Sequence, residues 1–318
     1  MKKISIIIPC YNASKYINKC LEALKNQDYK NFSVICIDDA STDSTYEIIN
    51  DYKLKNSLDI HIIRNYSNCG PAHSRNRGVL YAKSEFITFC DSDDWYEPNY
   101  LQRMIDTVEK NNTDIAFCGY QIVSVTGEIR KRPIKKNDFI TTPKEALGLG
   151  LDSLCMLIVK KELLMNCPWP NIRNGEDMAM VPLLICKCKK IAIVHECLYN
   201  YFTRSTSLSN NIKLSVVDSF VESFEFVRIN FPCDFIKECE FIGINNLLYG
   251  GLITLFTISK DKDYANEIIE NYEKYFPFWI KNPYIKQLPK YKKIVLFFIK
   301  NQCFFMIRLI AMIRKKTK

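Results

Sequence analysis

The stretch Phe86-Ile-Thr-Phe-Cys-Asp91-Ser-Asp-Asp94 places three carboxylates directly after a short apolar run. The run from Phe86 to Cys90 has the length and composition of a buried strand, and open α/β sheets bind their ligands beyond the carboxyl ends of their strands. Asp91 and Asp93, separated by one residue, can share a divalent cation that in turn holds a diphosphate. A solvated turn is the alternative, because Asp and Ser are common turn residues.

Strand-like and helix-like segments alternate around this stretch. Apolar runs predict strands, and segments with helical spacing predict the helices between them. The expected strands are residues 4–8, 32–37, 60–63, 86–90, 114–125, 156–159 and 191–194, and the expected helices are 17–24, 43–52, 72–82, one near 145, and 176–186. We therefore predict an α/β fold with a mostly parallel, Rossmann-like sheet covered by helices.

From about residue 212 onward the periodicity is helical, so we place a boundary near Asn210. This gives an α/β domain over residues 1–210 and a helical extension over 211–318. With 318 residues and 47% hydrophobic side chains, the chain can bury a full core. The 14 cysteines show no spacing typical of a zinc site or a disulfide framework. Met1-Lys2-Lys3 leads straight into the first strand, so we expect no secretion signal and a cytoplasmic protein with reduced thiols.

Polar residues also follow the first two predicted strands. Pro9-Cys-Tyr11-Asn12 ends the first strand, where the ring of Tyr11 could stack on a base and the amide of Asn12 could hold a ribose or anchor the turn. Asp39 follows the second strand, and its carboxylate could accept a hydrogen bond from a uracil N–H. Nearby Ser41 is expected to cap the next helix.

Two further segments combine charge with a predicted helix start. Arg75 lies at the beginning of the helix over 72–82, where a cation would suit a phosphate or a carboxylate of the acidic turn. Glu176 and Asp177 follow Gly175 at the start of the helix over 176–186. Acidic side chains are favoured in a first helical turn by the helix dipole alone, so these two could also be structural.

Taken together, four motifs resemble those of family 2 glycosyltransferases, strongly over residues 3–125 and more weakly to about 210. They are Pro9-x-Tyr11-Asn12, Asp38-Asp39-x-Ser41-x-Asp43, the segment from Gly70 to Gly78, and Asp91-x-Asp93-Asp94. Each motif is weak alone, but four in order at strand ends are specific. The resemblance implies a glycosyltransferase A-type fold and an inverting, hexosyltransferase-type transfer from a nucleotide diphosphate sugar, usually a UDP-sugar.

The resemblance also implies roles for individual residues. Pro9, Tyr11, Asn12 and Asp39 would hold the nucleoside, Arg75 and Ser92 would bear on the donor, and Asp91 would contact the ribose or the metal. Asp93 would be the main ligand of Mg²⁺ or Mn²⁺, which assists departure of the nucleotide diphosphate. Asp177 would be the general base for the acceptor hydroxyl, with Glu176 as the second choice. Arg204, in the segment from Tyr199 to Ser207, would clamp a phosphate or be a surface residue.

The C-terminal tail is strongly basic. Residues 281–318 contain 11 Lys or Arg and no Asp or Glu, whereas the chain before them carries 33 basic and 35 acidic residues. On one helix over 291–316, the cations form a stripe opposite a broad apolar arc. We expect an amphipathic helix that contacts the inner face of an anionic membrane. Docking on the body of the protein is the alternative, and nucleic-acid binding fits less well because bulky apolar residues flank the cations.

These features predict an enzyme that adds a sugar to a growing glycan, on a lipid carrier or a surface polysaccharide precursor. Two other functions stay open at this stage. A sugar nucleotidyltransferase also uses an α/β sheet and a metal, but it is expected to have a glycine-rich loop after the first strand, where Pro9 to Ser14 contains no glycine. A membrane-tethered module that binds sugar nucleotides or glycans without turnover is the non-catalytic alternative.

Overall fold

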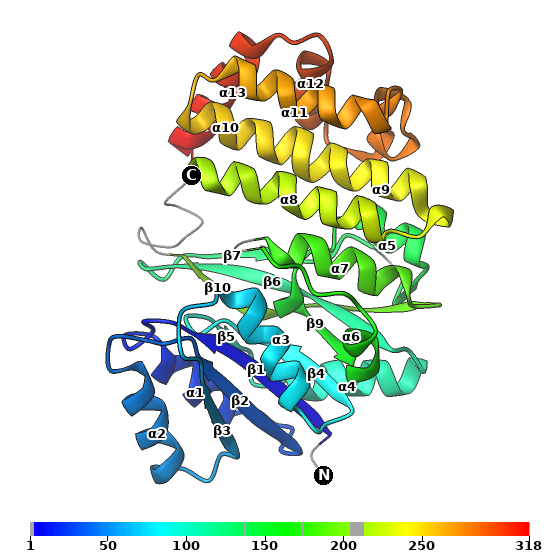
Figure 1. Cartoon of the computed structure of the whole chain (residues 1–318). Coiled ribbons are helices and arrows are strands. Elements are labelled where there is room, and N and C mark those ends of the chain that lie inside the picture. Colours follow the sequence, from blue (N-terminus) through cyan, green and yellow to red (C-terminus); the bar gives the residue numbers. More distant parts are fainter. Residues whose placement is uncertain (1–2, 137, 173–174, 204–212, 318) are drawn as a thin grey trace. The chain divides into compact units, whose positions relative to one another are not determined.

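The computed structural model describes residues 3–136, 138–172, 175–203 and 213–317. The chain divides into two compact units, Met1–Ser205 and Thr206–Lys318 (Figure 1). The first unit is built on a ten-stranded sheet. Eight strands follow the order β3-β2-β1-β4-β9-β6-β10-β5, and the other two are β7, which pairs with β6, and β8, which pairs with β10. Its strands are β1 (Ile4–Cys10), β2 (Phe32–Asp38), β3 (Ile60–Arg64), β4 (Phe86–Phe89), β5 (Trp95–Tyr96), β6 (Ile115–Ser124), β7 (Ile129–Arg132), β8 (Ile140–Thr141), β9 (Leu157–Lys160) and β10 (Ile191–Thr203).

The main strands of this sheet run in one direction. β3, β2, β1 and β4 pair in parallel, and β6 pairs in parallel with β10. Because β9 is antiparallel to both β4 and β6, these two groups point the same way. The carboxyl ends of β1, β2, β4 and β6 therefore meet at one edge. The predicted mostly parallel α/β sheet is confirmed.

Helices cover the sheet, and its central strands are almost completely buried. They are α1 (Ile17–Lys25), α2 (Thr45–Lys55), α3 (Pro71–Tyr81), α4 (Tyr100–Asn111), α5 (Pro143–Leu149), α6 (Lys161–Met165) and α7 (Glu176–Cys186). In β1, Ile6, Ile7 and Ile8 are all completely buried although their side chains alternate between faces, as expected for a strand covered on both sides. Gly78 lets α3 approach β1, since a Cβ there would lie 2.5 Å from Ile7 Cγ2.

Three sequence expectations differ from the structure. The helix α2 begins at Thr45 after Ser44, so Ser41 does not cap it; its hydroxyl oxygen instead accepts a hydrogen bond from the Asn12 N–H. β5 and α4 were not predicted. β10 is much longer than the expected 191–194, because after an irregularity near Cys197 it continues pairing with β6 and also pairs with β5.

The second unit is helical. It contains α8 (Leu214–Asn230), α9 (Ile236–Ile242), the π-helix η3 (Gly243–Gly251), α10 (Leu252–Ile258), α11 (Lys262–Tyr275), α12 (Lys290–Lys300) and α13 (Phe304–Thr317). Within the described residues, the stretch Cys233–Ile258 is the one helical stretch long and apolar enough to cross a membrane, and 67% of its most apolar window is buried inside the structure. The core helix of a soluble protein has the same properties.

The expected single helix over 291–316 is wrong, because the chain breaks between α12 and α13 at residues 301–303. Both helices bury one apolar side: Val295, Leu296 and Ile299 on α12, and Ile307 and Ala311 on α13. α12 contacts η3, and α13 contacts α10. Docking, the alternative left open by the sequence, thus accounts for part of the apolar surface. Other large apolar side chains of the tail stay exposed, namely Tyr291, Ile294, Phe297, Phe305, Leu309, Met312 and Ile313.

Candidate active site

The loops after β1 and β2 are tied together by side-chain hydrogen bonds. Asn12 has a left-handed backbone (φ 49°), and its Oδ1 accepts a hydrogen bond from the Thr42 N–H at 2.9 Å. The amide therefore anchors the turn, which was one of the two roles considered for it. Tyr11, beside it, is half exposed, and Pro9 is half-buried at the end of β1. The Tyr11 ring is thus accessible to a flat ligand at this edge of the sheet.

Asp39 is buried directly after β2 and shapes the neighbouring turn. Its Oδ1 accepts hydrogen bonds from Asn65 Nδ2 at 2.5 Å and from the Cys69 N–H at 3.0 Å, and its Oδ2 accepts one from the Gly70 N–H at 2.8 Å. These bonds hold the segment that leads into α3. A carboxylate offers about four acceptor sites, so Oδ2 keeps capacity for one further donor.

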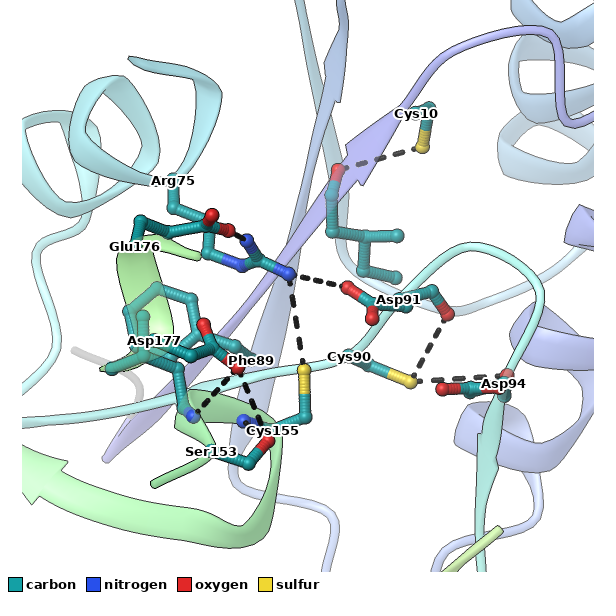
Figure 2. A network of polar contacts seen from close by, with 12 residues as sticks. Cys10, Arg75, Phe89, Cys90, Asp91, Asp94, Ser153, Cys155, Glu176 and Asp177 are labelled. Carbon is teal, nitrogen blue, oxygen red and sulfur yellow. Dashed lines mark hydrogen bonds and ion pairs between the residues drawn. The ribbon is translucent and has the colours of Figure 1, made fainter. Parts of the chain in front are cut away.

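Arg75 links two acidic elements that are far apart in the sequence. It projects from α3, is 4% exposed, and lies between Asp91 and Glu176 (Figure 2). Its Nη2 donates to Asp91 Oδ1 at 2.5 Å, and its Nη1 forms a short ion pair with the buried Glu176. Burial lowers the pKa of Arg75, but the charges of Asp91, Glu176 and Asp177 outweigh this and hold its pKa well above the ordinary value. The sequence left a phosphate or a carboxylate as its partner, and in the structure its partners are carboxylates.

The acidic turn after β4 is fixed by its last member. Asp94 is 1% exposed; its Oδ2 accepts a hydrogen bond from the Tyr199 hydroxyl at 2.5 Å, and its Oδ1 accepts one from the Phe202 N–H at 2.7 Å. Burial, together with the charges of Asp91 and Asp93, raises the pKa of Asp94 well above its ordinary range. Asp91, Ser92 and Asp93 are half-buried and remain accessible to a ligand.

Asp177, in the first turn of α7, has one bound and one unbound carboxylate oxygen. Its Oδ2 accepts hydrogen bonds from the Ser153 hydroxyl at 3.2 Å and from the Leu154 N–H at 3.3 Å. Among the residues that the structure describes, its buried Oδ1 has no hydrogen-bond partner. Burial raises the pKa of Asp177 to about 7; Arg75 opposes this shift, whereas Glu176 and Asp91 add to it. A carboxylate with this pKa and a vacant oxygen can accept a proton near neutral pH.

The structure therefore gathers Arg75, Asp91, Glu176 and Asp177 into one cluster, beside the half-buried turn at Ser92 and Asp93. Pro9, Tyr11, Asn12 and Asp39 lie at the ends of β1 and β2, at the same edge of the sheet. Arg204 is outside the described residues. Tyr199, at the start of the same segment, is buried, and its hydroxyl supports the acidic turn.

Two residues of this cluster were missed from the sequence. Ser153 precedes the short 3₁₀ helix η1 (Leu154–Met156) and orients Asp177. Cys155 is buried, with its Sγ 4.0 Å from Arg75 Nη2. Neither residue belongs to a recognisable catalytic motif in the sequence. Ser153 comes close to α7, and Cys155 close to α3, only in the folded chain.

The acidic turn offers carboxylates for a divalent ion. No cluster of three or more His, Cys, Asp or Glu side chains suited to a metal occurs in the described part of the chain. Because Asp94 accepts hydrogen bonds from the Tyr199 hydroxyl and the Phe202 N–H, Asp91 and Asp93 are the carboxylates that would hold an ion. One or two carboxylates are what Mg²⁺ sites shared with substrate phosphates use, water and phosphate oxygens completing the shell. The residues present therefore fit an ion that is held jointly with a diphosphate.

Comparison with known proteins identifies the family. A sequence model described as "Glycosyl transferase family 2" matches residues 5–167, slightly more than half of the chain. The chain belongs to this family. It is 32% identical over 207 residues to a poly(ribitol-phosphate) beta-glucosyltransferase of Bacillus spizizenii, covering 64% of this chain and 32% of that protein. It is 27% identical over 233 residues to the putative teichuronic acid biosynthesis glycosyltransferase TuaG of Bacillus subtilis, covering 72% of this chain and 90% of that protein.

Solved glycosyltransferase structures have a similar fold. The structure of Staphylococcus aureus TarS with UDP-GlcNAc superposes with a TM-score of 0.66 at 20% identity, covering 99% of this chain and 92% of that one. A mannosyltransferase from Pyrobaculum calidifontis, solved with GDP-Man and Mn²⁺, gives a TM-score of 0.59 at 13% identity, with coverage of 99% and 88%. The fold is of the glycosyltransferase A type with a helical C-terminal region, and the protein is a glycosyltransferase. This decides against the nucleotidyltransferase and the non-catalytic module.

Proposed function

We propose that this glycosyltransferase is an inverting, metal-dependent enzyme that moves a sugar from a UDP-sugar to a hydroxyl of a surface polysaccharide or its lipid-linked precursor. The environment of Asp177 carries the proposal. A buried carboxylate with one vacant oxygen and a pKa of about 7 suits the base that an inverting transfer needs. The relatives named for poly(ribitol-phosphate) and teichuronic acid support a surface polymer as the acceptor.

In this mechanism, the vacant Oδ1 of Asp177 accepts the proton of the acceptor hydroxyl as its oxygen attacks the anomeric carbon. The bond from that carbon to the diphosphate breaks, and UDP leaves from the opposite face, which inverts the centre. Ser153 and the Leu154 N–H keep Asp177 in one orientation. Arg75 is a positioning residue, because it holds Asp91 and Glu176 together and its charge favours the ionised form of Asp177.

The donor is proposed to lie along the ends of β1, β2 and β4. The Tyr11 ring stacks on the base, Pro9 lines that surface, and Asp39 Oδ2 accepts from the base N–H. Asp93 and Asp91 hold Mg²⁺ or Mn²⁺, with Ser92 between them. When bound, the ion supplies Lewis-acid stabilisation of the departing diphosphate. The complex of TarS with UDP-GlcNAc supports UDP as the nucleotide.

Donor-dependent thermal stabilisation tests the donor site. UDP-glucose, UDP-GlcNAc and GDP-mannose are added to the protein with and without Mn²⁺. A ligand at 100 times its Kd stabilises the folded state by about 2.7 kcal/mol, so a UDP-sugar with Mn²⁺ should raise Tm clearly. Asp93→Asn should abolish the Mn²⁺-dependent part. The matched control is Asp28→Asn, an exposed carboxylate in the loop before β2 and therefore at the opposite edge of the sheet. The metal assignment is wrong if both variants lose the Mn²⁺-dependent increase in Tm equally, or if Asp93→Asn keeps it.

We further propose that the enzyme works at the cytoplasmic face of a membrane, which it contacts through α12 and α13. The exposed apolar residues of these helices lie in a tail without acidic side chains, a combination that suits an anionic lipid surface. Phe297 and Phe305, 61% and 76% exposed, are the most accessible. Sedimentation with phosphatidylglycerol vesicles should capture the protein, and Phe297→Ser with Phe305→Ser should reduce capture severalfold. Leu54→Ser with Val125→Ser, on exposed apolar residues of the first unit, serves as the control pair. Equal binding by both double variants contradicts the proposal.

A further inference from the structure

A cavity of about 330 Å³ opens beside the candidate base. It lies between the middle of β6, the chain after β7 and the segment that connects α5 to η1. Ser153 lines it, and the hydroxyl of the same residue donates to Asp177 Oδ2. The cavity is therefore one side chain away from the carboxylate that is proposed to deprotonate the acceptor.

Two cations and one carboxylate line this cavity. Arg132 and Lys135 are exposed, and in the described part of the chain neither forms an ion pair. The neighbouring Lys136 differs, since it pairs with Glu145 and with Asp138. Asp152 also lines the cavity, so two positive charges face one negative charge. Tyr120 also lines the cavity. Burial raises the pKa of its hydroxyl, the charge of Arg132 lowers it and the charge of Asp152 raises it, so both charges lie near this ring.

The backbone fixes the position of Arg132. Gly119 has no side chain, and a Cβ there would lie 3.0 Å from both Arg132 O and Pro133 Cα. The chain leaving β7 thus rests directly on β6, and Arg132 is held by backbone pairing opposite Tyr120. Arg132 on this fixed strand, with Lys135 and hydroxyl groups nearby, outweighs the charge of Asp152 and forms a site suited to a phosphate ester.

We propose that this cavity binds a phosphate ester of the acceptor, so that the enzyme glycosylates a phosphate-bearing polyol or glycan and selects against neutral ones. This inference rests on the proposed function, because it takes Asp177 as the residue that the acceptor hydroxyl meets. Arg132 and Lys135 would be specificity-determining residues. They would bind the phosphate while the neighbouring hydroxyl reaches Asp177.

Calorimetry with three probes tests the site: glycerol 3-phosphate, glycerol and inorganic phosphate. We expect glycerol 3-phosphate to bind and glycerol not to bind. The double substitution Arg132→Gln with Lys135→Gln should weaken the binding of glycerol 3-phosphate by about tenfold or more. The matched control, Arg130→Gln with Lys131→Gln, removes the same charge from β7 at residues that do not line the cavity, and should bind as the wild type does. UDP affinity should be unchanged in both double variants.

Three results would overturn the inference. Equal weakening in both double variants would mean that overall charge, not the cavity, attracts the ester. Equal affinity for inorganic phosphate and the ester would mean that the cavity binds a free anion. Loss of UDP affinity in the Arg132 and Lys135 variant would assign the cavity to the donor. The proposed function fails separately: if Asp177→Asn left turnover intact, the base would be wrong while ester binding by the cavity would still be measurable.

Turnover supplies a second test once a donor is known. With a phosphate-bearing acceptor, the acceptor KM of the Arg132 and Lys135 variant should be about tenfold higher while kcat stays within about twofold. The reason is that the lost interaction stabilises the bound acceptor and the transition state equally. With a neutral acceptor, wild type and variant should show the same KM. A fall in kcat with an unchanged acceptor KM would contradict a binding role for the two cations.

Discussion

The pH dependence of turnover follows directly from the environment of Asp177. Its carboxyl must be ionised to accept a proton, and burial raises its pKa from 3.8 to about 7. The ionised fraction then rises from about one tenth at pH 6 to about nine tenths at pH 8, so kcat/KM should increase about tenfold over this interval. An Asp with its ordinary pKa would be almost fully ionised throughout, and the profile would be flat.

The assay is release of UDP in the presence of acceptor, measured between pH 5.5 and 8.5 at fixed ionic strength. Asp177→Asn should lower kcat by about 10²- to 10⁴-fold and leave donor affinity nearly intact. Its residual rate should also lose the acidic limb of the profile, which is the fall in rate below about pH 7. Asp28→Asn is the control and should retain both rate and profile. A flat wild-type profile between pH 6 and 8, or the same limb in Asp177→Asn, would refute the assignment. Collapse of donor affinity in Asp177→Asn would move this residue to the nucleotide site.

Two further predictions concern stability and the role of Arg75. Because the pKa of Asp177 is higher in the folded state than its ordinary value of 3.8, its protonation favours folding; this contribution is complete below about pH 3.8 and is lost as pH rises through about 7. Asp177→Asn should therefore be more stable than the wild type at pH 8, by on the order of 1 kcal/mol in urea unfolding, and lower stability would contradict this. Arg75→Met should cost about 3–5 kcal/mol, because it leaves Glu176 buried without a counter-charge. It should also shift the acidic limb to higher pH, since Arg75 lowers the pKa of Asp177. Arg77→Met on the same helix is the control, and an unmoved limb in Arg75→Met would refute the coupling.

Much of the first unit could be predicted because its signals are local. The apolar run over 86–90 and the acids that follow it are contiguous, so the strand β4 and its carboxylate turn were readable directly. The helix α7 was expected over 176–186 and occupies those residues. The helix α4 was not predicted, although Leu101, Ile105 and Val108 bury one face at helical spacing. The helical spacing that indicates α4 is therefore present in the sequence.

The tail shows where local periodicity misleads. One helix over 291–316 satisfied the amphipathic pattern, but the two halves pack against different neighbours, α12 against η3 and α13 against α10. Satisfying both contacts requires the break at residues 301–303, where Gln302 takes a left-handed backbone (φ 51°). Tertiary packing therefore overrode a pattern that was continuous in the sequence.

The sequence by itself determined the succession of strands and helices, the carboxylates at the strand ends and the glycosyltransferase family, because these depend on residues close together in the chain. The tertiary structure decided how those groups act. Arg75 and Glu176 are 101 residues apart, and Ser153 and Asp177 are 24 apart. The orientation of Asp177 and its pKa near 7 arise from burial and from charges that only the folded chain brings together.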